Sequence, residues 1–271
     1  MLFDTHCHLL DRAFDDNRAA VIQAIEASEI KYVTEIGLDY ESSKAVLDFS
    51  EKHDFAFAAI GWFPDETERL TEELLGKTMG LFKSPRAVAI GEIGLDYHYE
   101  DGADHEVQSY WFKRQLEEAF KLKAPVCIHS RDADADTMSI LKDCGMFSKE
   151  RYDSFAPLSD GSPDARVLLH CYSGSAELAK QYVKLGATIS LAGPLTFKNA
   201  RKAVETAEAV PLERLVVETD SPYMAPVPHR GEQNNPTLVE FTARKLAEIK
   251  GISYDAAASA TFANACRFYG I

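Results

Sequence analysis

Short apolar runs alternate with helix-like stretches along the whole chain of 271 residues. Eight runs have the character of strands: residues 2–9, 32–38, 55–62, 87–96, 125–130, 166–173, 187–193 and 214–222. Helix-like stretches lie between them, for example Asn17–Ser28, Ser42–His53, His105–Leu122 and Ala176–Leu185. Nearly continuous apolar strands that alternate with helices are typical of parallel strands covered by helices. Eight such units in about 250 residues predict an α/β fold, a (β/α)8 TIM barrel that forms one domain over residues 1–271.

An open, doubly wound sheet is the alternative architecture, because it also alternates strands and helices. Dinucleotide-binding sheets of this kind carry the glycine pattern G-x-G-x-x-G after their first strand. No such pattern follows residues 2–9, which favours the closed barrel.

The hexapeptide EIGLDY occurs twice, at residues 35–40 and 92–97. The residues that flank the two copies differ, so we interpret the copies as the second and fourth barrel strands and not as an internal repeat. Each copy places an acidic residue near the carboxyl end of a strand, where barrels carry their active sites. Glu35 and Glu92 are therefore rival candidates for the same chemistry.

Ionisable side chains gather at the carboxyl ends of the predicted strands: Asp4, His6, His8, Glu92, His129, His170, Glu218 and Asp220. A single histidine after an apolar run is usually a hydrogen-bonded residue of the core or rim. Four histidines at the same end of three strands, with carboxylates beside them, indicate a metal centre. Imidazole and carboxylate together suit zinc, manganese, nickel or iron, whereas magnesium prefers oxygen. The set is large enough for two ions about 3.5–4 Å apart if one carboxylate bridges them.

The charge balance limits the partners that the chain can bind. It carries 43 acidic and 29 basic residues, a net charge of −14, which argues against broad electrostatic binding of nucleic acid. A metal site could still hold phosphate locally. The five cysteines lack CxxC spacing, no apolar run reaches the roughly 18 residues of a membrane span, and no signal peptide is evident. We therefore expect a cytoplasmic protein with no membrane partner and no obligatory protein partner.

Six motifs follow one another between residues 3 and 236: FDTHCHL, GEIGLDYH, PVCIHSRDA, LLHCYSG, ETDSPY and HRGEQNNP. Together they resemble the TatD family of metal-dependent hydrolases, within the amidohydrolase-like metal barrels. The resemblance implies a TIM barrel, a divalent-metal cofactor and hydrolase activity. Several members of that family are deoxyribonucleases, often 3′-exonucleases.

The same resemblance implies two divalent cations, from among Zn, Mg, Mn and Ni. One would be held by His6, His8, Glu92 and Asp220, and the other by Glu92, His129 and His170. The family pattern has glycine before the glutamate and Asp-Tyr-His after it. Gly91 and His98 match this pattern around Glu92, whereas Thr34 and Glu41 do not match it around Glu35. The second copy of EIGLDY is therefore the expected metal-binding copy.

The resemblance has one departure near the predicted site. Family members commonly read G-x-H-P after the third strand, and this chain reads Gly61-Trp62-Phe63-Pro64. The missing histidine is not one of the implied metal ligands, so we expect metal binding to survive. Phe63 puts the substrate or leaving-group contacts on that side in doubt.

Roles in catalysis follow from these ligands. Two bound cations would make hydroxide available at neutral pH and polarise a phosphoryl oxygen, with Glu92 between them. Asp220 is the candidate general base, although it could instead be a ligand without a proton-transfer role. Arg131 and Arg230 could hold a phosphate through their planar forks, and a surface ion pair is as good an interpretation of either. Asp4 could orient a ligand histidine.

Three other features are given structural interpretations. The acidic run DADAD at 132–136 suits the start of a helix. Strand alternation points Cys7 and Cys171 away from the ligand face, and Cys127 is expected to be buried below His129. Residues 146–165 form a long irregular connection on the face away from the site.

Three functions remain open from the sequence. The first is a metal-dependent phosphodiesterase that acts on DNA ends or another phosphodiester. The second is a metal-dependent amide, ester or lactone hydrolase of the amidohydrolase type. The third is a binding protein that keeps a metal site without turnover.

Overall fold

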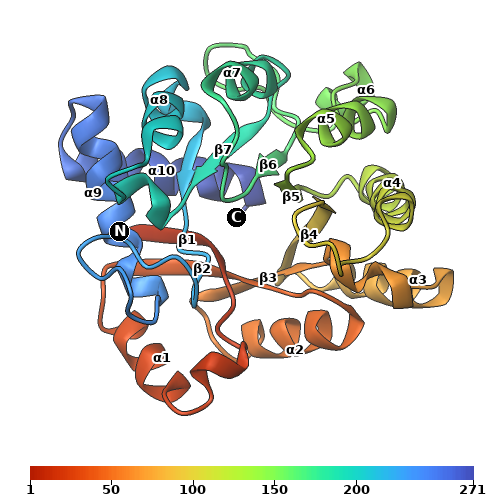
Figure 1. Cartoon of the computed structure of the whole chain (residues 1–271), viewed down its shortest axis with the longest axis horizontal. Coiled ribbons are helices and arrows are strands. Elements are labelled where there is room, and N and C mark those ends of the chain that lie inside the picture. Colours follow the sequence, from red (N-terminus) through yellow and green to blue (C-terminus); the bar gives the residue numbers. More distant parts are fainter.

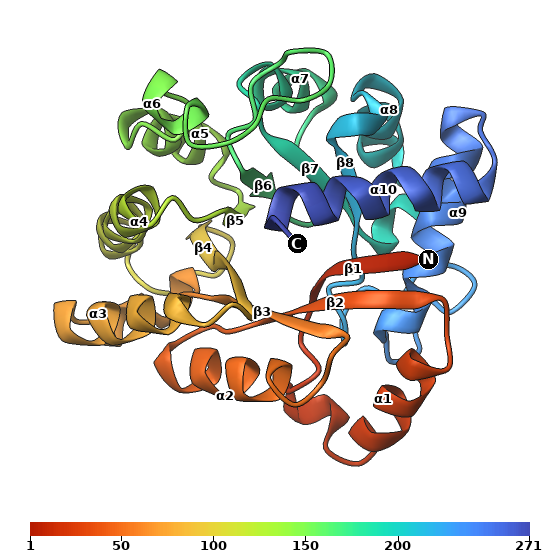
Figure 2. The same ribbon diagram turned by 180° about the vertical axis from the view of Figure 1, so that it is seen from behind.

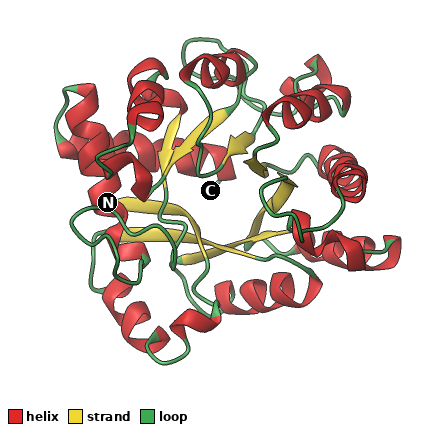
Figure 3. Ribbon diagram, in the orientation of Figure 1, coloured by secondary structure: helices red, strands yellow, loops and turns green.

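The fold is a parallel β-barrel surrounded by helices, in a computed structural model that describes residues 1–271 (Figures 1 and 3). The eight strands pair in sequence order, each parallel to the next. They are β1 (Leu2–Cys7), β2 (Ile30–Ile36), β3 (Ala56–Ile60), β4 (Ala87–Asp96), β5 (Val126–Arg131), β6 (Val167–Leu169), β7 (Thr188–Leu191) and β8 (Leu215–Val217). The predicted (β/α)8 barrel is confirmed, and the open sheet is excluded.

Helices follow the strands and cover the outside of the barrel. They are α1 (Arg18–Glu26), α2 (Tyr40–Ser50), α3 (Glu72–Gly80), α4 (His105–Lys121), α5 (Asp134–Asp143), α6 (Lys149–Tyr152), α7 (Ala176–Lys184), α8 (Arg201–Ala209), α9 (Val239–Lys250) and α10 (Tyr254–Tyr269). Short 3₁₀ helices are η1 (Arg12–Phe14), η2 (Pro64–Arg69), η3 (Leu81–Lys83), η4 (Gly193–Thr196), η5 (Leu212–Arg214) and η6 (Pro236–Leu238). None of the helices is both long and apolar enough to cross a membrane.

The barrel closes between β1 and the segment that follows β8. Cys7 forms a parallel bridge with Ser221. The N–H of His8 donates to the carbonyl of Ser221 at 2.8 Å, and the N–H of Asp220 donates to the carbonyl of His6 at 2.9 Å. This seam joins the two ends of the sheet, and it places Asp220 beside the first strand.

The amino-terminal end of the barrel is plugged by α10, which crosses the face nearest the viewer in Figure 2. Phe268 and Tyr269 at the end of this helix pack into an apolar cluster with interior strand residues such as Phe3 and Cys127. The hydroxyl of Tyr269 donates to the carbonyl of Thr5 at 2.7 Å. Because one end is filled, only the carboxyl end of the barrel is open for a substrate.

Two strands end earlier than the apolar pattern predicts. Strands β6 and β8 stop before His170 and Asp220, so both residues lie in the loops that follow. Cys171 and Asp220 have positive φ angles of 40° and 54°. The expectation for Cys171 is therefore wrong: strand alternation no longer applies there, and its side chain lines the cavity above the barrel.

Residues 146–165 do lie away from that cavity, but they are less irregular than expected. They contain α6, and the Arg151 side chain is almost fully buried. Its guanidinium donates to the carbonyls of Ala124 and Ala165, just before β5 and β6, at 2.7 and 2.9 Å. The connection therefore seals the amino-terminal end of these strands. The acidic run at 132–136 begins α5, as predicted.

Candidate metal centre

The six side chains singled out as metal ligands meet at the carboxyl end of the barrel. They come from β1, the residue after it, β4, β5 and the loops after β6 and β8: His6, His8, Glu92, His129, His170 and Asp220. Two groups offer donor atoms within 4.8 Å of one another, and both contain His6. The first also contains Glu92 and His170, and the second also contains His8 and Asp220.

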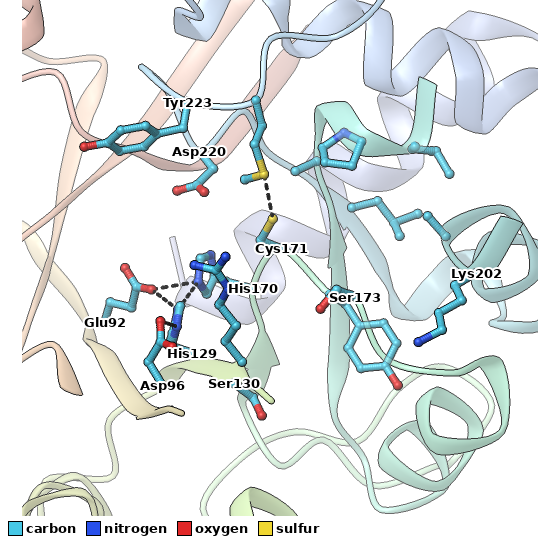
Figure 4. Close-up of a pocket in the computed structure, with 18 of the residues that line it drawn as sticks. Glu92, Asp96, His129, Ser130, His170, Cys171, Ser173, Lys202, Asp220 and Tyr223 are labelled. Atoms are coloured by element: carbon cyan, nitrogen blue, oxygen red, sulfur yellow. Dashed lines mark hydrogen bonds and ion pairs between the residues drawn. The ribbon is translucent and has the colours of Figure 1, made fainter. Parts of the chain in front are cut away.

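Glu92 lies at the centre of this arrangement, and Figure 4 shows His129 and His170 turned towards it. Its Oε1 atom is 2.6 Å from Nδ1 of His129 and 2.7 Å from Nε2 of His170. Its Oε2 atom is 3.2 Å from Nε2 of His6. Asp220 Oδ1 closes the other side, at 3.6 Å from His6 Nε2 and 3.4 Å from His8 Nε2.

The donor atoms fit bound cations. Both ring nitrogens of His6 are buried and lack a hydrogen-bond partner, as does Nδ1 of His170. An unpaired buried polar group is costly, so it calls for a partner. Burial and the neighbouring His170 lower the pKa of His6, which keeps its imidazole neutral, as a metal ligand must be. Neutral imidazoles and carboxylates converging on one space are the donor set of a transition-metal site.

Without a cation, the carboxylates and imidazoles offset one another's charge. Burial would raise the pKa of Glu92, but the surrounding imidazoles, led by that of His170, hold it well below its usual value. Burial would lower the pKa of His170, but Glu92 and Glu218 outweigh burial and hold it well above its usual value. The carboxylate is thus already charged and available to a cation, which must displace a proton from His170.

Two further carboxylates hold the histidines from behind. Asp96 accepts from Nε2 of His129 at 3.0 Å. Oε1 of Glu218 lies 3.4 Å from Nδ1 of His170, near enough for charge attraction but without the geometry of a hydrogen bond. Such partners fix the orientation of a ligand imidazole. Asp96 was missed from the sequence, although its spacing of four from Glu92 on one strand already placed both on the same face. Asp4, the residue expected to play this part, makes no hydrogen bond to an imidazole. It accepts from the backbone N–H groups of His6 at 3.3 Å and Thr219 at 2.8 Å, so it holds the backbone of a ligand histidine.

The two copies of EIGLDY have different roles in the structure. In the second copy, the glutamate and aspartate point into the metal centre. In the first copy, Glu35 lies outside both donor groups, and Asp39 caps α2 by accepting from the N–H of Ser42 at 2.7 Å. Glu35 is fully buried and accepts from the N–H groups of Leu9 and Leu10, both at 2.8 Å. It therefore anchors the turn that directly follows His8.

A pH-dependent stability test follows from this anchor. Burial, partly offset by the donors from Leu10 and Leu9, raises the pKa of Glu35 from 4.5 to about 7. The native state binds this proton more tightly than the unfolded state does. The protonated Glu35 therefore contributes fully to the free energy of unfolding below pH 4.5, and this contribution is lost as pH rises through 7. Glu35→Gln mimics the protonated form. The free energy of unfolding of this variant, minus that of wild type, should therefore increase by up to about 3 kcal/mol between pH 4 and 8. Urea unfolding of chelated protein measures this, and parallel pH profiles would contradict it.

A cavity of about 1010 Å³ opens above the metal residues. Arg131 lines it, and its guanidinium donates to the hydroxyl of Tyr99 at 3.0 Å and lies 5.0 Å from the centre of that ring. Phe63 also lines it, with its ring 4.9 Å from that of His129. Arg230 is not among the lining residues; its guanidinium lies 4.3 Å from the centre of the Phe197 ring, which is part of the wall.

Comparison with known proteins decides what this barrel is. The family model described as TatD related DNase matches residues 3–270. The chain belongs to the TatD family.

Relatives of this TatD chain cover its whole length. The uncharacterized metal-dependent hydrolase YabD of Bacillus subtilis is 36% identical over 271 residues, 100% of both chains. The uncharacterized metal-dependent hydrolase TatD of Mycobacterium tuberculosis is 32% identical and covers 100% of this chain and 98% of its own. The crystal structure of YJJV, a TatD homolog from Escherichia coli, has a TM-score of 0.86 with 26% identity and covers 100% and 98% of the two chains. The TatD chain is a metal-dependent hydrolase.

Proposed function

We propose that this TatD protein is a divalent-metal-dependent phosphodiesterase that acts on the ends of DNA strands, as a 3′-exodeoxyribonuclease. The observation that carries the proposal is the position of Glu92, which lines the cavity. Its Oε1 atom lies within 2.7 Å of nitrogens of His129 and His170, and its Oε2 atom lies 3.2 Å from Nε2 of His6. Two adjacent cation sites suit phosphoryl transfer, because both the attacking and the leaving oxygen then face a positive charge. Glu92 would be the shared carboxylate, and the six residues of the candidate metal centre would hold both ions.

When bound, the cations supply a hydroxide nucleophile at neutral pH and polarise the phosphoryl oxygen. Asp220 serves as the general base. Burial would raise its pKa, but the hydrogen bond from His8 and the charge of His170 help to hold it below its usual value, so the carboxylate stays ionised. Asp220 also lines the cavity, so an oxygen atom there can accept a proton from a water beside the substrate.

Arg131 is the cation best placed to hold the phosphodiester. It lines the cavity, and none of its guanidinium nitrogens takes part in a salt bridge. Its stacking on Tyr99 leaves the planar fork able to bind phosphate oxygens. We assign it a substrate-binding role on these grounds.

The acidic surface predicts how DNA is held. With a net charge of −14, binding should depend on the metal centre and a few cations, and not on a long basic groove. Each neutralised phosphate of a single strand contributes about −0.7 to the slope of the logarithm of the binding constant against the logarithm of the salt concentration. Because only a few phosphates should be contacted, we expect a slope no steeper than about −2. Linear single strands should be cut and closed circles should not. Binding and cleavage over a salt series at fixed metal concentration measure both, and efficient cutting of circles would contradict end dependence.

The substrate class can be tested directly. Metal content should be measured by elemental analysis, and the loaded protein offered 3′-ended oligonucleotides, simple phosphodiesters, amides, esters and lactones. We expect phosphodiester hydrolysis that a chelator abolishes and added metal restores. Preferential hydrolysis of the amide or lactone substrates would support the amidohydrolase alternative, and turnover of none would support a metal-binding protein without catalysis.

A further inference from the structure

The cavity extends beyond the metal centre into a second region, which we call the apolar arm. It lies among the loops that follow β6, β7 and β8, and its walls are Tyr172, Leu191, Pro194, Leu195, Phe197 and Met224. None of the six candidate metal ligands forms part of these walls. An apolar space joined to a polar reaction centre is a place for a ring or hydrocarbon group of the substrate.

The apolar arm ends in positive charge. Lys202, in the first turn of α8, lines the cavity and makes no salt bridge or hydrogen bond in the structure. Asp134 is near enough for Lys202 to act on its pKa, but the two do not pair within 4 Å. Figure 4 shows Lys202 on one side of the cavity, with Glu92 and His129 on the other. In a chain of net charge −14, an unpaired lysine on a cavity wall is available to an anion of the ligand.

One wall of the apolar arm is a supported aromatic ring. The Arg230 guanidinium lies over one side of Phe197, 4.3 Å from the ring centre. A ring held in this way is a stacking platform for a flat ligand group. This explains how Arg230 can matter without touching phosphate: it positions Phe197.

The ligand that fits the whole cavity has an anion at each end and a flat ring between them. We propose that the apolar arm is the subsite for the terminal nucleotide of the strand, with its base against Phe197 and Met224 and a 3′-phosphate at Lys202. The nucleotide's 5′-phosphate is then the group at the metal centre. This inference rests on the proposed function and deepens it, because Lys202 would then recognise DNA strands that end in a 3′-phosphate.

Three ligands separate the contributions by calorimetry on the metal-loaded protein. Inorganic phosphate should bind chiefly at the metal centre, where the cations attract an anion more strongly than one lysine does. Thymidine 5′-monophosphate adds the base and sugar, and thymidine 3′,5′-bisphosphate adds the second anion. We expect the base to tighten binding about 10-fold, as stacking on one aromatic ring does. The 3′-phosphate should tighten it about 10-fold more, as a charge-assisted hydrogen bond does.

Two variants with matched controls locate each gain. Phe197→Ala should abolish the gain from the base, whereas Tyr110→Ala, an exposed aromatic residue on α4 outside the cavity, should not. Lys202→Ala should abolish the gain from the 3′-phosphate, whereas Lys198→Ala, an exposed lysine on the same connection outside the cavity, should not. Inorganic phosphate should bind all four variants as it binds wild type.

The outcomes distinguish this subsite from the proposed function. Equal affinity of wild type for the three ligands overturns the subsite, and so does a loss of phosphate affinity that matches the loss of nucleotide affinity in either variant. Hydrolysis of bis(p-nitrophenyl) phosphate reports on the proposed function separately. Tight bisphosphate binding without that hydrolysis would support the subsite and contradict the proposed phosphodiesterase activity.

Discussion

Glu92→Gln should abolish hydrolysis and reduce the metal content of the purified protein. The carboxylate is within 3.2 Å of three imidazole nitrogens, and no other carboxylate reaches both His129 and His6. A catalytic cation contributes several kcal/mol to transition-state stabilisation, so its loss should lower turnover by about 10³-fold or more. Elemental analysis and steady-state kinetics at saturating metal measure the two effects.

The matched control is Glu35→Gln, the same substitution in the other copy of the hexapeptide. Its carboxylate holds the turn after His8 from outside the donor groups, and glutamine keeps one acceptor for that turn. We expect its metal content and turnover to stay near those of wild type. Equal loss of metal in the two variants would show that Glu92 is not the shared ligand.

Asp220→Asn should keep part of the metal and lose most of the turnover. The amide oxygen can still point at a cation, but the amide cannot take up a proton. A general base contributes about 10²–10⁴-fold in rate, and we expect a loss in this range in kcat. The acidic limb of the pH–rate profile that reports this base should disappear as well. Metal content and the pH dependence of kcat measure the effect.

Asp132→Asn is the control for this experiment, because it removes an exposed carboxylate that does not line the cavity. Its kcat should remain within a few fold of wild type. A normal kcat in Asp220→Asn with full metal occupancy would mean that Asp220 is a ligand only, and that another group accepts the proton.

The barrel and the convergence of its polar side chains could be predicted from the sequence because they depend on local patterns. Strands β1, β4 and β5 follow their apolar runs closely, so His6, Glu92 and His129 lie at the predicted strand ends. Register shifts between Asp4 and Cys7 in β1, and between Ile90 and Ile93 in β4, help to turn two of these side chains inward, and alternation does not predict them. The pattern fails where the chain leaves the sheet. His170 and Asp220 reach the centre from loops with their own backbone geometry, which hydrophobic periodicity does not encode.

The supporting residues were hard to find for a different reason. Glu35 and Glu92 are followed by the same five residues, yet one binds backbone amides and the other faces imidazoles. Their flanking residues separate them in the sequence, but the contacts that each glutamate makes depend on which strand lies beside it in the closed barrel. Lys202 and Phe197 carry no motif at all. They come together with the metal centre only because η4 and the start of α8 follow β7 into the cavity wall.

Because of the seam between β1 and the segment after β8, the metal centre takes its ligands from the beginning of the chain and from a segment near its end. His6 and His8 are on one side of the seam, and Asp220 is more than two hundred positions later on the other. A partly made or partly opened chain therefore has no complete second donor group. A cation that binds only the closed barrel shifts the equilibrium between open and closed forms towards the closed form by mass action. Bound metal should therefore raise the free energy of unfolding, and its removal should make the first and last strands easier to separate.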